Sequence, residues 1–453
     1  GKADFKSSRC AAPVRHRRHS APTSMNGRNE RPKLSEIGRA SAPNQIKTLI
    51  APFIGVDDVA HLAAGAPPTS VFPVTGLKLE LADGGVVDIG TEVMSNAQQY
   101  QYARSGYTPL LEWCRDFTAK YHRGTTDEWS VALTCGSTDA ISKLVEVVCD
   151  PGDVVLCEAY TWSTPLDGMR SRGIHLVGID VDDHGMVPSA LKREIISAEA
   201  SGRTIKALYI VPNGSNPCGT TLLPERFAQI YELCVAHGVL VLEDDPYWWL
   251  GLGGAKEPLP GPPTSFAAID TDARVVRIDS FAKSIAPGFR LGWLSGPPRF
   301  VNAFNAACST STHNGSPFAM AALHALLEHW GEAGLHAHIE RMRTEYRRRL
   351  HVILGAADKH LAGLASWRAP KAGMFLFLDL SPSGVEDSTK LLPMLREHRV
   401  LTIPSAVFSP SGTPSPHMRI SFSQASDDDI AKGISRLGAL LREHKTTRRG
   451  AGS

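Results

Sequence analysis

The spacing of hydrophobic positions changes repeatedly along the chain from about Thr91 onward. Apolar residues three and four apart predict helices at 139–148 and 224–237, and Gly238 follows the second helix as a C-cap. Short continuous apolar runs predict buried strands at 154–157, 174–179, 205–211, 239–242 and 275–278. Strands that alternate with helices predict an α/β fold with a mostly parallel sheet and helices on both faces. Binding sites in such sheets lie at the carboxyl ends of the strands.

A different pattern begins near Ser316. A long helical pattern runs to about Ala356, strands are predicted at 374–380 and 418–422, and a last helix is predicted at 427–443. These elements predict a second, smaller α+β domain. We therefore divide the chain into a disordered leader (1–33), an N-terminal arm with part of the small domain (34–90), a large domain (91–325), a small C-terminal domain (326–445) and a frayed tail (446–453).

Composition and charge narrow the class of protein. The 453 residues are 21% charged and 42% hydrophobic, with a formal net charge of +2, as in an ordinary enzyme. We therefore expect no nucleic-acid partner and, because no apolar run is long enough to span a bilayer, no membrane partner. The eight cysteines are scattered without CxxC pairs, so we expect reduced thiols, no metal site and a cytoplasmic enzyme.

The first 24 residues differ from the rest. They hold six Lys and Arg residues and a single acid, Asp4, a composition that is typical of a mitochondrial transit segment. Pro13, Pro22 and the lack of amphipathic spacing favour instead a disordered leader, or translated sequence upstream of a start at Met25. We favour the second interpretation and keep a mitochondrial location as the alternative.

The segment 280–293 carries the strongest chemical motif. Ser280, Lys283 and Arg290 follow a predicted strand, with the serine three residues before the lysine and the arginine seven after it. Pyridoxal 5′-phosphate (PLP) chemistry needs these groups together. The lysine amine forms an imine with the cofactor aldehyde, and the serine hydroxyl and the arginine fork bind the phosphate. A lone lysine is usually a solvated surface residue, but one inside this string predicts a PLP enzyme.

Two further strand ends carry polar groups that suit the same cofactor. Asp244 ends a predicted strand and would keep a pyridine nitrogen cationic, and Tyr247 would donate to the phenolic oxygen. Asn216 precedes a proline and would donate to the same oxygen. Taken alone, the first motif is also a common turn, and the second is equally well explained as a plain loop.

Three weaker features complete the set. Gly136, Ser137 and Thr138 open a helix whose free N–H groups suit a phosphate, although an ordinary N-cap looks the same. Arg419 lies in a predicted small-domain strand, where it would grip a carboxylate if it is not a surface residue. Trp162 or Tyr160 would stack on the cofactor ring, although either would serve equally as a core aromatic.

Together these motifs resemble fold-type I PLP enzymes of aminotransferase class I/II. Within that class they are most similar to kynurenine/2-aminoadipate aminotransferases and fungal aromatic amino acid aminotransferases. The resemblance covers roughly 34–443 and includes the segments 62–67, 71–73 and 373–375. It implies an aspartate aminotransferase-like PLP-transferase fold, with a large domain built on a mostly parallel sheet and a smaller α+β domain.

The resemblance also implies a role for each matched residue. Lys283 carries the cofactor and shuttles the proton, Asp244 faces the ring nitrogen, and Tyr247 and Asn216 flank the phenolic oxygen. The phosphate is held by Gly136, Ser137, Thr138, Ser280 and Arg290. Trp162 is the stacking residue, by its offset from Glu158. The substrate is held by Arg419 at its α-carboxylate, and by Asn216, Gly65 and Lys47.

Two positions depart from the family pattern. The family places a partner-subunit tyrosine on the phosphate, which implies a homodimer, but Tyr100 and Tyr102 are each one residue off the usual spacing. Lys47 stands where the subgroup often has an arginine, and a lysine is a point charge rather than a planar fork. Acidic distal groups would therefore be held less tightly. Trp248 and Trp249 would add aromatic bulk near the site, which favours aromatic substrates.

The function that these residues predict is transamination between an amino acid and a 2-oxo acid. The donor is expected to be aromatic (tryptophan, phenylalanine, tyrosine or kynurenine), and the acceptor 2-oxoglutarate or an aryl pyruvate. One alternative is other PLP chemistry on the same fold, such as a β-lyase or a cyclopropane-forming lyase. The other is a non-enzymatic regulator with this fold, which we disfavour because only a short leader precedes the fold in this sequence.

Overall fold

The computed structural model describes residues 31–42, 45–53, 56–60, 62, 65–99, 106–122, 129–253 and 260–451. Its centre is a seven-stranded sheet in the order β3-β11-β10-β9-β8-β4-β5. The strands are β3 (Ser130–Thr134), β4 (Val154–Glu158), β5 (His175–Ile179), β8 (Ile205–Ile210), β9 (Leu240–Asp244), β10 (Val275–Ser280) and β11 (Gly292–Gly296). The five predicted strands form the parallel part of this sheet, and only β11 runs antiparallel to its neighbours.

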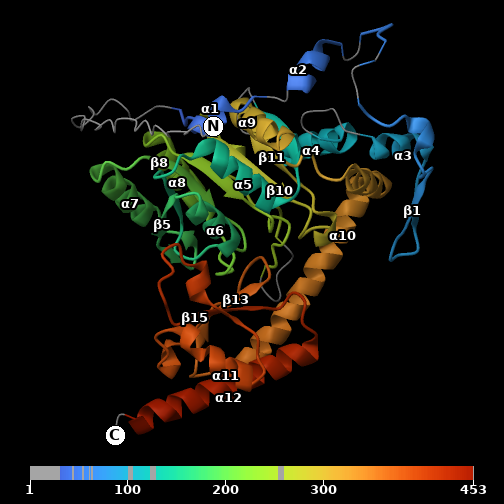
Figure 1. The fold of residues 1–453 in the computed structure, drawn as a ribbon. Helices are drawn as coiled ribbons and strands as arrows, with labels where there is room; N and C mark the ends of the chain where they lie inside the picture. The colour runs from blue at the N-terminus through green and yellow to red at the C-terminus, as the bar shows by residue number, and fades with distance from the viewer. Residues whose placement is uncertain are drawn as a thin grey trace, which may run out of the picture.

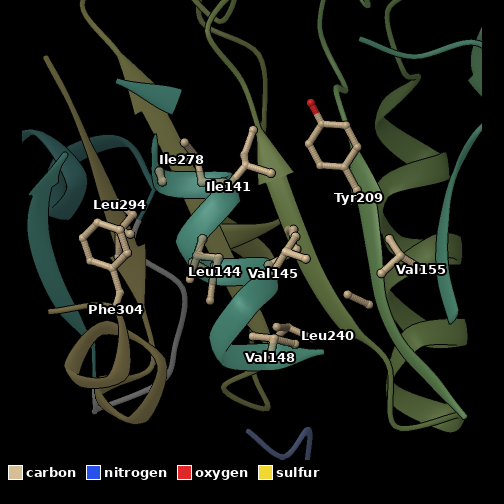
Figure 2. Packing of buried hydrophobic residues seen from close by; sticks show 14 of the residues in the cluster. Ile141, Leu144, Val145, Val148, Val155, Tyr209, Leu240, Ile278, Leu294 and Phe304 are labelled. Carbon is tan, nitrogen blue, oxygen red and sulfur yellow. The ribbon is translucent and has the colours of Figure 1, made fainter. Parts of the chain in front are cut away.

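Helices cover both faces of the large sheet, as predicted. One face packs against α5 (Ser137–Val148), α6 (Ser163–Ser171) and α9 (Pro298–Ser309). The other face packs against α4 (Thr108–Tyr121), α7 (Pro188–Ala200) and α8 (Pro224–Ala236). Figure 2 shows the apolar stripe of α5, from Ile141 to Val148, directed at strand residues such as Leu240 and Ile278. This packing fixes the start of α5 against the carboxyl ends of the strands.

A second, antiparallel sheet has the order β12-β13-β15-β14. Its strands are β12 (Ser366–Trp367), β13 (Phe375–Asp379), β14 (Ile403–Pro404) and β15 (His417–Ser421). The long helix α10 (Pro317–His360) connects the two sheets and is kinked at Gly331, whose φ is 56° (Figure 1). α11 (Leu392–Glu397) and α12 (Asp427–Ala451) complete this smaller domain. The predicted α/β large domain with a small α+β domain is confirmed.

The N-terminal elements are α1 (Glu36–Ala40), α2 (Gln45–Ile50), the β1–β2 hairpin (Leu77–Glu80, Val86–Ile89) and α3 (Thr91–Gln98). Of these, α1 packs on α5 and α9, whereas β2 and α3 pack on α10. A second short hairpin, β6–β7 (Val181–Asp182, Gly185–Met186), follows β5. We expected part of 34–90 to join the small domain, but Val87 and Ile89 pack in one apolar cluster with Trp293 of β11 and with α10. The other predicted domain boundaries stay predictions.

The last helix extends into the segment after residue 445, for which we expect a frayed tail. The helix α12 continues to Ala451. Arg448 donates to the carbonyl of Gly384 and pairs with Glu386 at 2.9 Å, and Lys445 donates to the carbonyl of Gly363 at 3.3 Å. These contacts hold the last turns against loops of the small domain, which hydrophobic spacing alone does not reveal. None of the helices in the described ranges is long and apolar enough to cross a membrane.

Candidate active site

The polar segments predicted to carry chemistry meet at one edge of the large sheet. β8, β9 and β10 are adjacent and parallel, so the residues that follow them lie side by side. These residues are the loop to Asn216, the turn from Asp244 to Tyr247, and the loop with Lys283. The amino end of α5 approaches the same edge. Segments as distant in the sequence as Ser137 and Lys283 are thereby brought to one edge of the sheet.

Asp244 is a buried carboxylate with one oxygen free. It is 1% exposed, and its Oδ2 accepts a hydrogen bond of 2.8 Å from the hydroxyl of Tyr209. Its buried Oδ1 has no hydrogen-bond partner among the residues that the structure describes. Burial raises the pKa of Asp244 to about 7, and the hydrogen bond from Tyr209 and the nearby hydroxyl of Ser137 both oppose that rise. Such an oxygen suits a cationic N–H donor, which would satisfy it and hold it ionised.

Lys283 lies in the loop after β10 and is half-buried. Burial lowers the pKa of its amine, and the positive charge of Arg290 lowers it further. A lowered pKa increases the fraction of neutral amine at physiological pH. The neutral amine is the nucleophilic form that condenses with an aldehyde.

Arg290 and the start of α5 form a cradle beside Lys283. Arg290 has a left-handed backbone (φ 54°), and its Nη2 lies 3.2 Å from the point where a Cβ on Gly136 would sit. Gly136 has φ 90°, so a side chain there would be strained and would also press on the guanidinium. Within the described part of the chain the buried Oγ of Ser137 makes no well-formed hydrogen bond, although it lies close enough to Asp244 to lower the pKa of that carboxylate; Thr138 is exposed. The cradle fits a phosphate.

Ser280 ends β10, on the chain segment that leads to Lys283. Its Oγ accepts from the backbone N–H of Ala282 at 3.1 Å, and its hydroxyl proton remains available to a ligand. Asp139 is turned away from the start of α5, where it pairs with Lys143 and accepts from the N–H of Cys135. Its charge therefore does not oppose an anion at the cradle directly.

Arg419 reaches across from the small sheet to the large one. Its Nη1 donates to Oδ1 of Asn216 at 2.8 Å. The guanidinium carbon lies 4.5 Å from the ring centre of Phe375 and 4.7 Å from that of Phe408, so the planar group is held between two aromatic faces. This arrangement leaves the fork able to bind a carboxylate bidentately.

The aromatic candidates separate clearly. Tyr247 is buried, and burial and the charge of Asp244 both raise the pKa of its phenol, so the phenol is a hydrogen-bond donor. Trp162 packs against the same apolar cluster as Tyr247. Tyr160 turns instead toward the small sheet, with its ring 5.3 Å from Phe377 and 5.5 Å from His417. This geometry supports Trp162 rather than Tyr160 as the stacking residue.

One interpretation of the sequence needs correction. Trp248 and Trp249 were expected to add aromatic bulk near the substrate. Both instead pack against Phe117 of α4, and the Nε1 of Trp248 donates to the carbonyl of Pro263 at 3.0 Å. The turn after Tyr247 carries them to the α4 face of the sheet, the face opposite α5. The preference for aromatic substrates cannot rest on these two residues.

For four predicted residues the described part of the structure gives no side-chain contact at the site. Gly65 is exposed, and a Cβ placed on it would meet no described atom within 4 Å. Lys47 lies in α2, but its side chain lies outside the described residues, as do Tyr100 and Tyr102. Their roles therefore stay predictions.

Sequence reasoning missed Tyr209. It lies near the carboxyl end of β8 within a buried, mostly apolar run, and Figure 2 shows its hydroxyl pointing away from the valine and leucine side chains of the core. A buried tyrosine hydroxyl needs a partner, and this requirement was the available signal. The partner, Asp244, lies 35 residues further along the chain. It could be identified only once the strand order was known.

Comparisons with known proteins agree with this geometry. The family model for aminotransferase class I and II matches residues 58–437. A mitochondrial kynurenine/alpha-aminoadipate aminotransferase of Bos taurus is 33% identical over 401 residues, which span 85% of this chain and 92% of that protein.

Two solved structures share the whole fold. The aromatic aminotransferase Aro9 of Candida albicans has a TM-score of 0.81 and 25% identity, covering 91% of this chain and 98% of that one. Pyrococcus horikoshii kynurenine aminotransferase, solved in complex with PMP, KYN as substrates and KYA as products, has a TM-score of 0.71 and 26% identity, covering 90% and 96%. This chain belongs to the aminotransferase class I and II family.

Proposed function

We propose that this aminotransferase uses pyridoxal phosphate held on Lys283 to exchange the amino group of an aromatic amino acid with a 2-oxo acid. The observation that carries the proposal is the buried, unpartnered Oδ1 of Asp244, at the same sheet edge as the lysine and the cradle of Arg290 and Gly136. Asp244 suits the ring nitrogen of the cofactor, Lys283 suits its aldehyde, and the cradle suits its phosphate.

Each protein group would contribute a definite step. The bound cofactor supplies an electron-poor ring that takes up the electron pair left when the Cα–H bond breaks. Asp244 would hold the ring nitrogen protonated, because its Oδ1 would accept a hydrogen bond from the N–H of that nitrogen. Nζ of Lys283 would remove the Cα proton and return it to the cofactor side, acting as general base and then as general acid. Tyr247 and Asn216 would orient the ring from its phenolic oxygen.

Arg419 would bind the α-carboxylate of the amino acid. Its Nε is buried without a hydrogen-bond partner among the described residues, although its Nη1 is engaged by Asn216. A bidentate carboxylate would satisfy this donor and fix the orientation of the substrate. The rings of Phe375 and Phe408 flank the guanidinium of the half-buried Arg419, and this partial burial strengthens the pairing.

An aromatic donor is favoured by the relatives. The bovine relative is a kynurenine/alpha-aminoadipate aminotransferase, the archaeal one is a kynurenine aminotransferase, and the Candida enzyme is an aromatic aminotransferase. Within this chain, Phe375 lies beside both Arg419 and Tyr247, with its ring 6.1 Å from that of Tyr247. An aryl side chain would find an apolar wall there. The acceptor would be 2-oxoglutarate or an aryl pyruvate.

We also propose a homodimer in the cytoplasm. The arm near α2 leaves large apolar side chains exposed, with Leu49 at 72% and Leu62 at 95%, and α2 lies apart from both sheets (Figure 1). A second copy of the chain would cover this surface. If sites are shared, mixing a Lys283→Ala chain with a chain in which Tyr100 and Tyr102 are both Phe restores activity. Each variant assayed alone should be inactive, so that activity in the mixture can come only from sites shared between the two chains.

One experiment tests the proposed reaction. Purified enzyme is mixed with a panel of amino acids, and pyridoxamine phosphate and the released oxo acid are quantified by chromatography. We expect aromatic donors to give both products, and Lys283→Ala to give neither, whereas the exposed Lys432→Ala behaves as wild type. A lyase would release ammonia without pyridoxamine phosphate, and this outcome would exclude transamination.

A further inference from the structure

A buried ionic cluster lies directly behind the candidate active site. Arg277 of β10 is fully buried and contacts three carboxylates: its Nη1 lies 3.1 Å from Oε1 of Glu243 and 3.2 Å from Oδ2 of Asp245, and its Nη2 lies 2.8 Å from Oδ1 of Asp279. All three acids are also buried. Isolated charges are costly in a protein interior, so this guanidinium is what allows three carboxylates to remain there.

The cluster is on the face of the sheet opposite Asp244. In the register of β9 and β10, Arg277 pairs with Glu243 and Ile278 pairs with Asp244. Successive residues of a strand point to opposite faces, so Glu243 and Arg277 share one face while Asp244 and Ile278 share the other. Ile278 belongs to the core beneath α5, and Trp248 covers Arg277 at 6.0 Å from the far side. Arg277 therefore does not reach the cofactor or the substrate.

The contacts of Arg277 connect the three segments that form the site. Asp245 follows Asp244 and also accepts 2.8 Å from Nδ2 of Asn213, which lies in the loop that carries Asn216. Asp279 precedes Ser280 and the loop that carries Lys283, and it accepts from both Nε and Nη2 of Arg277. One guanidinium thus connects the ends of β8, β9 and β10, each of which presents a predicted active-site residue on the other face.

We propose that Arg277 is a positioning residue of this enzyme: acting from behind the sheet, it fixes the segments of Asn216, Asp244 and Lys283 relative to one another for cofactor binding. The inference rests on the proposed function, because it needs a cofactor at that edge. The planar fork matters, since a lysine ammonium is a point charge and cannot hold two carboxylates in one plane. Partners that orient the groups around a bound centre commonly change its affinity 10- to 100-fold when they are replaced.

The charges of the cluster also act on the pKa of Asp244 in the candidate active site. The negative charge of Asp279 raises the pKa of Asp244, and the positive charge of Arg277 lowers it. The acids of the cluster also respond: burial raises the pKa of Glu243 and of Asp279, and that of Asp245 to about 7, while Arg277 opposes each rise. His122 faces the cluster, and burial and Arg277 both hold its pKa low, so it stays neutral.

The chain offers a matched control, Arg274. It is also buried, it precedes β10 at the opposite end of the strand, and it donates to Asp272 and to the carbonyl of Cys234. Arg277→Lys and Arg274→Lys therefore remove the same fork from two buried sites, one within β10 and one just before it. Both variants should lower the melting temperature. Only the Arg277 variant should affect the cofactor.

The test measures the dissociation constant of pyridoxal phosphate for the cofactor-free protein by tryptophan fluorescence, and the pH dependence of the bound cofactor's absorbance. For Arg277→Lys we expect about a tenfold or greater weakening and a shifted pH dependence. For Arg274→Lys we expect wild-type values for both. Asp245→Asn, which keeps its size and its acceptor for Asn213, should weaken binding in the same direction and serves if Arg277→Lys does not fold.

Two outcomes would overturn the inference in different ways. If Arg277→Lys and Asp245→Asn lose thermal stability but bind the cofactor with wild-type affinity and pH dependence, Arg277 only stabilises the fold. If the wild-type chain binds no pyridoxal phosphate, the proposed function itself fails, and this inference fails with it. The two failures are distinguishable, because only the second abolishes cofactor binding by the wild-type chain.

Discussion

Arg419 donates to Asn216 at 2.8 Å although 203 residues separate them, and this hydrogen bond joins the small sheet to the active-site edge of the large one. β15 contributes the arginine, and the loop after β8 contributes the asparagine. A substrate carboxylate bound by Arg419 would therefore be held at the junction of the two domains. Residues that flank such a junction can couple substrate binding to domain closure.

Replacing Arg419 with lysine should raise the KM for amino acids more than it lowers kcat. Lysine keeps the charge but loses the fork and its stacking between Phe375 and Phe408. Loss of one charge-assisted contact of this kind, about 2–3 kcal/mol, predicts a fall of roughly 100-fold in kcat/KM. The half-reaction with phenylalanine, followed by stopped-flow absorbance, measures this effect. An amine without a carboxylate should react equally with both enzymes, and if its rate falls as well, Arg419 acts elsewhere.

Replacing Asp244 with asparagine should raise the stability of the cofactor-free protein at high pH and lower its catalytic activity. The native carboxyl keeps its proton up to about pH 7, whereas the unfolded one loses it near pH 4, so the ionisation of Asp244 destabilises the cofactor-free protein as pH rises through that window. Asparagine keeps the acceptor for Tyr209 without this cost. We expect Asp244→Asn to gain stability relative to wild type at pH 8 but not below pH 4, measured by urea unfolding.

The same substitution should nearly abolish catalysis. A neutral amide cannot hold a cationic ring nitrogen, and loss of a charge that stabilises the developing carbanion typically costs at least about 100-fold in kcat. Single-turnover rates with an aromatic donor measure the loss. A variant that is both more stable at high pH and fully active would contradict the role given to Asp244.

The Tyr209→Phe substitution should weaken binding of the cofactor, although the Tyr209 hydroxyl acts through Asp244 and not on the cofactor itself. The hydroxyl satisfies one oxygen of Asp244 and helps to keep its pKa from rising further. Its loss leaves that oxygen unpaired and should weaken pyridoxal phosphate binding by about tenfold. Tyr231→Phe is the matched control, because its hydroxyl donates to Asp270 at the same 2.8 Å, away from the site. Equal losses of affinity in both variants would point to general destabilisation instead.

The limits of sequence reasoning follow from where the partners lie. Asp244 and Lys283 could be predicted because their spacing from strand ends is local. Tyr209 and Arg277 could not, since their partners are set by strand order and by which face each residue occupies. The wrong prediction for Trp248 has the same cause. Trp248 follows Tyr247 directly in the sequence, but it packs on the α4 face of the sheet, whereas Tyr247 packs on the α5 face.

Gly136→Ala should weaken phosphate binding beyond its effect on folding. The backbone at this position has a φ of 90°, which strains any residue with a side chain. The new methyl group would also lie 3.2 Å from Nη2 of Arg290, so the guanidinium would have to shift. Gly152→Ala carries the same backbone strain, with φ 93°, in a turn where nothing lies within 4 Å. Each substitution should cost about 1–3 kcal/mol of unfolding free energy through strain.

Only the first of these two glycine variants should change the cofactor's affinity. Isothermal titration with pyridoxal phosphate, and separately with inorganic phosphate, compares the variants with wild type at a temperature where both are folded. A displaced Arg290 predicts weaker binding of both ligands by Gly136→Ala and unchanged binding by Gly152→Ala. If Gly136→Ala binds phosphate as wild type does, the cradle of Gly136 and Arg290 is not the phosphate site, and the cofactor must be held by other groups at this edge.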